Sequence, residues 1–189
     1  MKAQNTTASW GWVARLFHWG MAGLILFQFG LGVWMTRDRV DLLTRFDLTQ
    51  IHKSWGVLIF GLALARLAWR LANRMRPALP ADMPCWQRRA ARASHVALYV
   101  LMLVLPLSGW VQAAAAPEQD ILGIENRVFG TFALPDPWQP GVASIAEAAG
   151  AVHSSCAWTL AALLLVHAGA ALLHQFRARD GVLARMIFG

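Results

Sequence analysis

The chain has 189 residues, of which 57% are hydrophobic and 14% are charged, and its mean hydropathy is +0.43. This composition is too apolar for an ordinary soluble protein and predicts an integral membrane protein. The formal net charge of +7 would suit a nucleic-acid-binding protein, but the distribution of the charges along the chain argues against that class.

Four stretches are long and apolar enough to cross a bilayer core, which needs about 20 residues per helix. They cover residues 13–34, 51–71, 95–116 and 152–176. We therefore predict a single membrane domain over residues 1–189, an all-α four-helix bundle. Residues 35–50 and 73–94 are expected to be connections, with Ser94 capping the third helix. The long outer segment 117–150 is expected to fold back over the outer end of the bundle.

The charged residues are distributed unevenly across the predicted membrane. Twelve of the 17 basic residues fall on one side, and eight of the ten acidic residues fall on the other. The positive-inside rule makes the basic side cytoplasmic, which places both termini inside. The excess positive charge is thus a topology signal, and lipid is the expected partner. The five basic residues on the outer side are Arg37, Arg39, Arg45, Lys53 and Arg127.

Four histidines fall inside these apolar stretches at two depths. His52 and His153 lie toward the outer ends of their helices, and His18 and His167 lie toward the inner side. His153 and His167 share one face of the fourth helix but are separated by about 21 Å along it, so they cannot bind one metal ion. Polar side chains inside a bilayer are costly and indicate function. Depth pairs His52 with His153 and His18 with His167, and each pair can supply both axial nitrogens of a haem that transfers electrons.

Several alternatives remain at this stage. His174 is about 20° from His167 around the helix and can compete for the inner haem. Arg66 either extends to the cytoplasmic interface or pairs with a haem propionate. A haemless membrane anchor, in which the histidines only hydrogen-bond to neighbours, is the alternative to haem binding. No Cys-X-X-Cys-His motif occurs, which excludes the usual covalent attachment of haem.

These histidines stand in segments that resemble the bacterial cytochrome b561 family, in the wider group that includes the membrane cytochrome b of nickel-iron hydrogenases. The matching segments are Leu16-Phe17-His18-Trp19, Ile51-His52-Lys53-Ser54-Trp55-Gly56, Val152-His153 and Leu165-Val166-His167-Ala168-Gly169-Ala170-Ala171-Leu172-Leu173-His174. The resemblance implies a four-helix bundle in the bacterial inner membrane. It also implies two haem b groups, with His18, His52, His153 and His167 as axial ligands.

The resemblance further implies electron exchange with ubiquinone and, in some members, oxidation of superoxide on the outer side. We therefore expect a superoxide:ubiquinone oxidoreductase. Lys53 and the four outer arginines are candidates for attracting superoxide, although the acidic excess on the outer side counts against broad electrostatic steering. The alternative is a cytochrome b subunit that links a periplasmic dehydrogenase or hydrogenase to the quinone pool. Candidates for quinone or propionate contacts are Arg66, Arg92, His95 and His174.

Overall fold

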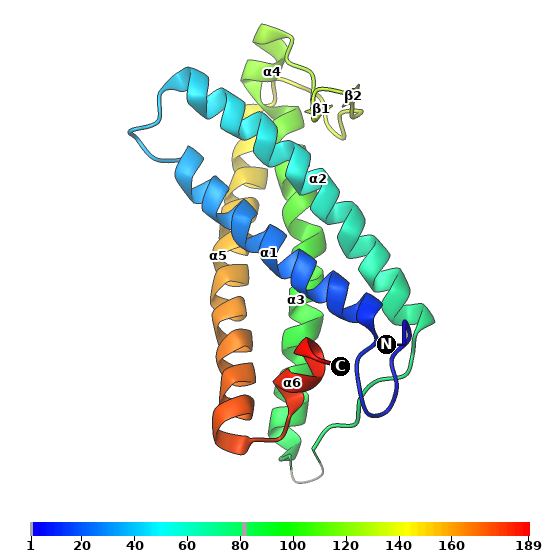
Figure 1. Ribbon diagram of the computed structural model, residues 1–189. Helices are drawn as coiled ribbons and strands as arrows, with labels where there is room; N and C mark the ends of the chain where they lie inside the picture. Colours follow the sequence, from blue (N-terminus) through cyan, green and yellow to red (C-terminus); the bar gives the residue numbers. More distant parts are fainter. Residues whose placement is uncertain (1, 81–82) are drawn as a thin grey trace.

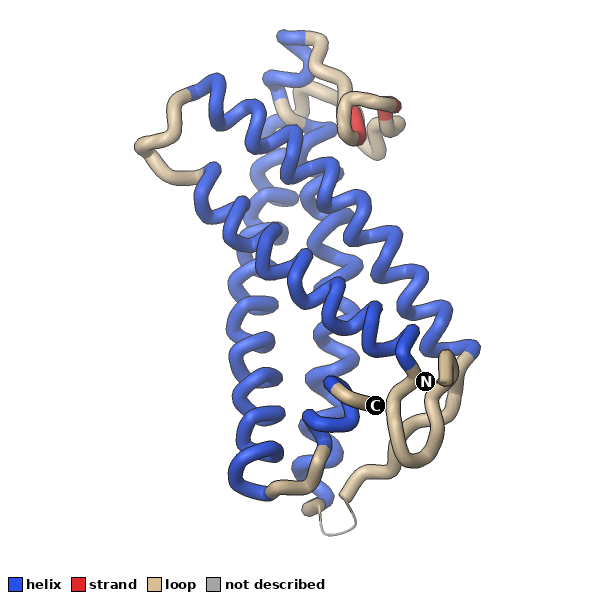
Figure 2. The backbone as a smooth tube through the Cα atoms, viewed as in Figure 1, coloured by secondary structure: helices blue, strands red, loops and turns tan. Residues whose placement is uncertain are grey.

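The computed structural model describes residues 2–80 and 83–189 as a bundle of long helices (Figure 1). The long helices are α1 (Trp12–Met35), α2 (Leu42–Ala72), α3 (Cys85–Ala115) and α5 (Ala143–Leu173). The short elements are α4 (Pro117–Leu122), the strands β1 (Arg127–Val128) and β2 (Phe132–Ala133), the π-helical turn η1 (His174–Ala178) and α6 (Val182–Ile187). Helices dominate the fold, and the strands are confined to one hairpin (Figure 2). The expectation of an all-α membrane bundle is confirmed.

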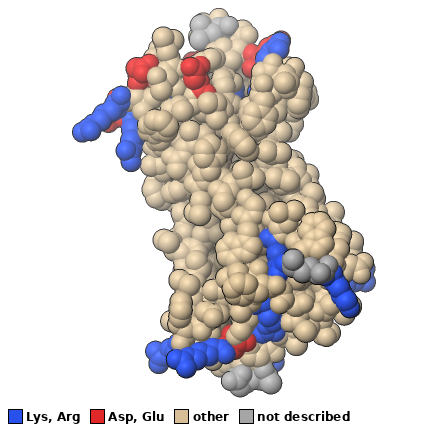
Figure 3. Space-filling view, viewed as in Figure 1, with Lys and Arg blue, Asp and Glu red and all other residues tan. Residues whose placement is uncertain are grey.

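Each long helix is apolar enough and long enough to cross a membrane. Their outward surfaces carry large apolar side chains, such as Leu26 and Leu165, which are 65% and 76% exposed. Exposed leucines at this frequency are costly in water but favourable against lipid tails. Charged side chains gather toward the two ends of the molecule and leave an uncharged band between them (Figure 3). These features make the chain a multi-pass membrane protein.

The helices pack as two neighbouring pairs. α1 lies along α2, α3 lies along α5, and the contact between α2 and α3 joins the pairs. The core lies in the middle of the bundle and takes residues from all four helices, including Met21, Ile59, Met102 and Leu160. Leu160 stands two helical turns from both His153 and His167. An apolar layer therefore separates the outer and inner histidine levels.

Three of the long helices begin earlier than hydropathy predicts. α2 begins at Leu42, where the Asp41 carboxylate accepts a hydrogen bond of 3.0 Å from the Thr44 backbone N–H. That hydrogen bond lowers the pKa of Asp41. α5 begins at Ala143, inside the segment expected to be an outer connection. Hydropathy detects only the part of a helix that lies in lipid, and these polar first turns lie beyond it.

The expected cap at Ser94 is wrong. α3 begins at Cys85, directly after Pro84, and the Ser94 hydroxyl donates a hydrogen bond of 3.0 Å to the Ala91 carbonyl within the helix. Pro84 takes the position before the helix, where its missing N–H costs nothing. The predicted connection 73–94 therefore ends at Pro84.

Both termini lie at the same end of the bundle, opposite α4 and the hairpin (Figure 1). At that end, α6 folds back onto the beginning of α1. The Trp19 indole donates a hydrogen bond of 3.0 Å to the Met186 carbonyl, and Arg15 donates one of 3.3 Å to the Ile187 carbonyl. The positive-inside rule assigns this end to the cytoplasm, and we refer to it as the inner end.

Candidate functional site

The outer histidine pair lies between α2 and α5. The ring centroids of His52 and His153 are 6.1 Å apart, with an angle of 75° between the ring planes. The pairing expected from depth is thus present in the structure. Because α5 packs mainly on α3 and not on α2, the two rings bridge helices from different packed pairs.

The ring of His153 is held by α3. Its Nδ1 atom lies 2.9 Å from the Leu105 carbonyl oxygen and 3.3 Å from the Ser108 hydroxyl. A carbonyl can only accept, so Nδ1 carries the proton and Nε2 keeps its lone pair. Gly109 leaves the space that the ring needs, because a Cβ at this position would lie 3.0 Å from His153 Cε1. α3 therefore fixes both the position and the tautomer of this imidazole.

The ring of His52 is approached by two residues of α1. The Gln28 side-chain amide donates a hydrogen bond of 2.6 Å to the His52 backbone carbonyl, and a Cβ at Gly32 would lie 3.3 Å from His52 Cε1. His52 Nδ1 is buried and has no hydrogen-bond partner within the described part of the chain. A buried ring nitrogen without a partner is costly, so this imidazole is held in place by packing against α1 and not by a hydrogen bond from its ring.

The inner histidine pair lies between α1 and α5. The ring centroids of His18 and His167 are 6.2 Å apart, with an interplanar angle of 52°. A third imidazole, His95 of α3, lies 5.3 Å from the His167 ring. The inner level thus gathers three imidazoles from three helices, whereas the outer level has two.

Two arginines of α2 reach this inner level. Arg66 Nη2 lies 3.2 Å from His18 Nδ1, and the guanidinium groups of Arg66 and Arg70 lie 5.5 and 5.1 Å from the centre of the Tyr99 ring. Arg66 therefore extends toward His18 inside the bundle. From this position its guanidinium group could contact a cofactor bound next to His18. Among the described residues neither arginine has a carboxylate within ion-pair distance. The inner level therefore holds positive charge that no acidic side chain balances among residues 2–80 and 83–189.

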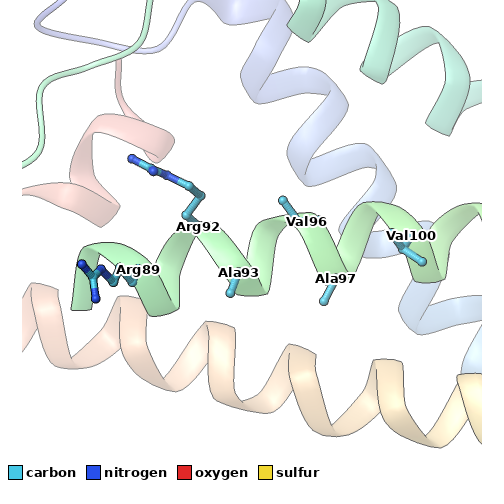
Figure 4. Close-up of a pocket in the computed structure, with 6 residues that line it drawn as sticks. All are labelled: Arg89, Arg92, Ala93, Val96, Ala97 and Val100. Atoms are coloured by element: carbon cyan, nitrogen blue, oxygen red, sulfur yellow. The ribbon is translucent and has the colours of Figure 1, made fainter. Parts of the chain in front are cut away.

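His174 lies apart from the two pairs. Its Nδ1 atom forms a short hydrogen bond with the Asp180 carboxylate, across the turn η1 that follows α5. Arg92 lies elsewhere again, on the lining of an open groove along α3 with a volume of about 510 Å³ (Figure 4). The groove has Arg89 and Arg92 at its inner end and the apolar Val96 and Val100 further along.

The five outer basic residues do not form one cluster. Lys53 donates a hydrogen bond of 2.9 Å to the Asn126 side chain, and Arg127 forms an exposed ion pair of 2.8 Å with Glu125. Arg45 donates to the carbonyls of Arg37 and Val40. Within the described chain, the side chains of Arg37 and Arg39 have no hydrogen-bond or ion-pair partner. Among these five candidates, only Arg37 and Arg39 have side chains without a hydrogen-bond partner in the described residues.

Sequence reasoning missed several residues that surround the histidines: Gln28, Arg70, Tyr99, Leu105, Ser108 and Gly109. Gln28 and Ser108 could have been identified from the sequence, because each is a polar side chain in an apolar helix. Tyr99 is the only tyrosine in the chain. Leu105 carries no such signal, because it contributes a backbone carbonyl.

Comparison with known proteins places the chain in a family. The model of the family described as "Prokaryotic cytochrome b561" matches residues 9–189. The chain is 33% identical to cytochrome b561 homolog 2 of Escherichia coli K12, over 99% of this chain and 95% of that protein. It is 29% identical to cytochrome b561 homolog 1 of the same organism, over 74% of each chain. The chain therefore belongs to the prokaryotic cytochrome b561 family and is a multi-pass bacterial membrane protein that transfers electrons through haem b.

Proposed function

We propose that the chain binds two haem b groups, an outer one between His52 and His153 and an inner one between His18 and His167. We further propose that it oxidises superoxide on the outer side of the membrane and reduces ubiquinone on the inner side. The observation that carries this proposal is the presence of two imidazole pairs with ring separations of 6.1 and 6.2 Å.

The ring separations fit two imidazoles that share one metal ion. Two metal–nitrogen bonds of about 2 Å, together with about 1 Å from each nitrogen to its ring centre, give a separation of about 6 Å. No group of three or more His, Cys, Asp or Glu side chains that could hold a metal ion occurs in residues 2–80 and 83–189. A pair with only two protein ligands suits a porphyrin, which supplies the other four nitrogens itself.

The arginines of the inner level support haem binding there. Haem b carries two propionate carboxylates, and Arg66 and Arg70 provide two cations without an acidic partner among the described residues. A guanidinium only donates hydrogen bonds, so contact with Arg66 makes His18 Nδ1 the acceptor and leaves the proton on Nε2. Ligation through Nε2 needs the opposite tautomer, and a propionate that receives Arg66 would release His18 Nδ1 to carry the proton.

The contact between His174 and Asp180 supports His167 as the inner ligand. His167 faces His18 across a separation suited to one metal ion, while His174 is already paired in the turn after α5. We therefore assign His167 to the haem. His174, His95 and Arg92 are left as the candidate quinone contacts at the inner end.

The paired histidines would hold each haem through two ring nitrogens, and the bound haem would supply transfer of one electron at a time. Two superoxide anions each lose one electron and become two molecules of dioxygen. One ubiquinone takes the two electrons and two protons and becomes ubiquinol. Arg37 and Arg39 are the outer cations free to attract the anion, and the inner histidines can deliver protons to the quinone.

A second candidate function is supported by the charge of the outer side. The eight acidic residues there outnumber the five basic ones, which suits contact with a basic patch on a protein more than attraction of a small anion. In this alternative the chain is the cytochrome b subunit that carries electrons from a periplasmic dehydrogenase or hydrogenase to the quinone pool.

One experiment on the purified protein separates these functions. We expect two haems per chain, and anaerobic mixing with superoxide should reduce haem, which added ubiquinone should then reoxidise. A matched substitution, Cys85→Ser at an exposed free thiol, should change neither result. Haem that superoxide does not reduce, together with co-purification of a periplasmic dehydrogenase, would favour the subunit function. A protein that contains no haem would refute both functions and identify a membrane anchor.

A further inference from the structure

The three residues that follow His52 in α2 all contact the outer hairpin. Lys53 Nζ donates a hydrogen bond of 2.9 Å to Asn126 Oδ1. The Ser54 hydroxyl accepts one of 2.9 Å from the Phe129 backbone N–H, and the Trp55 ring meets the Phe129 ring edge-on at 5.5 Å. We call this set of contacts the outer anchor. It joins the helical turn that carries His52 to a segment more than 70 residues later in the chain.

A buried polar network continues from Lys53 into the outer segment. The Asn126 amide donates to Gln119 Oε1 at 3.0 Å and to Asp136 Oδ1 at 2.6 Å, and Gln119 donates to the other oxygen of Asp136 at 2.6 Å. Asn126 and Gln119 are only 5% and 9% exposed. Every donor and acceptor of the Asn126 side chain is thus engaged. Since buried amides are costly when unpaired, loss of Lys53 would leave an orphaned acceptor.

Phe129 depends on the anchor for its backbone conformation. It has a φ of +47°, in the left-handed region that a bulky residue rarely adopts, and Gly130 follows with +69°. A strained backbone conformation persists only where the surrounding contacts contribute more stabilisation than the strain costs. The hydrogen bond from its N–H to Ser54, which is 2% exposed, and its contact with Trp55 supply that constraint.

The same helical turn is also held by α1. Gln28 donates to the backbone carbonyl of His52 at 2.6 Å. Contacts with both α1 and the hairpin therefore hold the helical turn that carries His52.

We propose that Lys53 is a positioning residue for the outer haem site, which fastens the hairpin to α2 and so fixes the turn that carries His52. Lys53 does not serve as an attractor for superoxide, because its ammonium group is committed to Asn126 and linked through it to the carboxylate of Asp136. This inference rests on the proposed haem site at His52. It does not depend on superoxide as the substrate.

The test compares substitutions for which anchoring and attraction predict different results. Hydrogen–deuterium exchange at the Phe129 amide reports the anchor directly, and a redox titration reports the outer haem. If Lys53 anchors the hairpin, Lys53→Met and Asn126→Leu should both raise the exchange rate of the Phe129 amide by about tenfold, the change expected when one hydrogen bond is lost. Asn126→Leu removes the same hydrogen bond as Lys53→Met but leaves the net charge unchanged. Both should also shift the midpoint potential of the outer haem, whereas Lys53→Arg, which keeps a cationic donor, should restore both values.

Arg39→Met is the charge-matched control, because Arg39 is also an outer cation but forms no hydrogen bond or ion pair with the hairpin residues that the structure describes. It should leave exchange at Phe129 unchanged. Asp136→Asn tests the same network from its other end, because loss of the carboxylate weakens its hydrogen bonds with Asn126 and Gln119 and should raise exchange at Phe129. If Lys53→Met does not accumulate in the membrane, Ser54→Ala can replace it. This substitution removes the hydrogen bond between Ser54 and the Phe129 N–H without changing the charge, and it should loosen the hairpin in the same way.

Unchanged exchange in both Lys53→Met and Asn126→Leu would overturn the proposal. So would a reaction with superoxide that slows in Lys53→Met but not in Asn126→Leu. Because the exchange measurement needs neither superoxide nor quinone, a failure of the proposed enzymatic activity would leave this result standing. A protein without haem would instead show the anchor in exchange but no potential to shift.

Discussion

Replacement of Gly109 by alanine tests whether His153 is held as a haem ligand. A Cβ at position 109 would lie 3.0 Å from His153 Cε1 and 3.1 Å from Nδ1. Carbon atoms pack at about 3.5 Å or more, so the ring must retreat by about 0.5 Å. That movement strains the hydrogen bond of 2.9 Å between His153 Nδ1 and the Leu105 carbonyl.

The magnitude depends on whether the ring is free to move. Alanine is favoured over glycine inside a helix by about 1 kcal/mol, and a typical hydrogen bond contributes about the same. Without haem the two effects nearly cancel, because the ring can rotate away. With haem the displaced nitrogen also weakens the bond to iron, and loss of a partner that orients a ligand lowers metal affinity by about 10-fold to 100-fold.

The assay is the haem content of the purified protein, measured by absorbance of the pyridine complex. For Gly109→Ala we expect a fall from two haems per chain toward one, with the inner haem retained. Gly61→Ala is the matched control, because no atom lies within 4 Å of the added Cβ. It should keep both haems and gain stability. Two haems with an unchanged spectrum in Gly109→Ala would show that His153 is not held at this place by iron.

Three further predictions concern the inner end. His167→Ala should lose one haem while His174→Ala keeps both, measured by the same absorbance, and the reverse result would make His174 the ligand. Arg66→Met should lower the midpoint potential of the inner haem by tens of millivolts in a redox titration, because a nearby cation favours the reduced state. Arg66→Lys should retain most of the potential, and equal shifts in both variants would argue against a charge effect. Asp180→Asn should weaken the contact with His174 and speed hydrogen exchange in α6 without loss of haem, whereas unchanged exchange would show that the contact of Trp19 with Met186 holds α6 by itself.

Hydropathy and the positions of the histidines predicted most of the fold and the two levels of the site. A bilayer restricts each apolar stretch to one crossing, so sequence position translates directly into depth. Depth alone was enough to pair His52 with His153 and His18 with His167, and both pairs are adjacent in the structure. The same argument does not apply to a soluble protein, because no membrane fixes the position of a residue along the axis of the bundle.

The contacts that hold the rings could not be predicted in the same way. Leu105 contributes only its backbone carbonyl, from 48 residues away, and nothing in a leucine side chain marks that role. The connection between Lys53 and Asn126 spans 73 residues and depends on the course of the outer segment. In the sequence, Lys53 is a basic residue on the outer side next to a histidine. Its hydrogen bond with Asn126 is visible only in the structure. Helix starts such as Cys85 were missed because the first turns of a membrane helix need not be apolar.

α5 supplies one ring to each histidine pair, and this has a consequence for how the protein is made. During synthesis, α1, α2 and α3 enter the membrane before α5. His18 and His52 are therefore in the bilayer before His167 and His153, with which they pair. If the chain binds two haems as proposed, neither haem would have both of its histidine ligands in a nascent chain that lacks α5. A truncation after α3 should integrate into the membrane as a colourless protein, and cofactor loading should be among the last events of biogenesis.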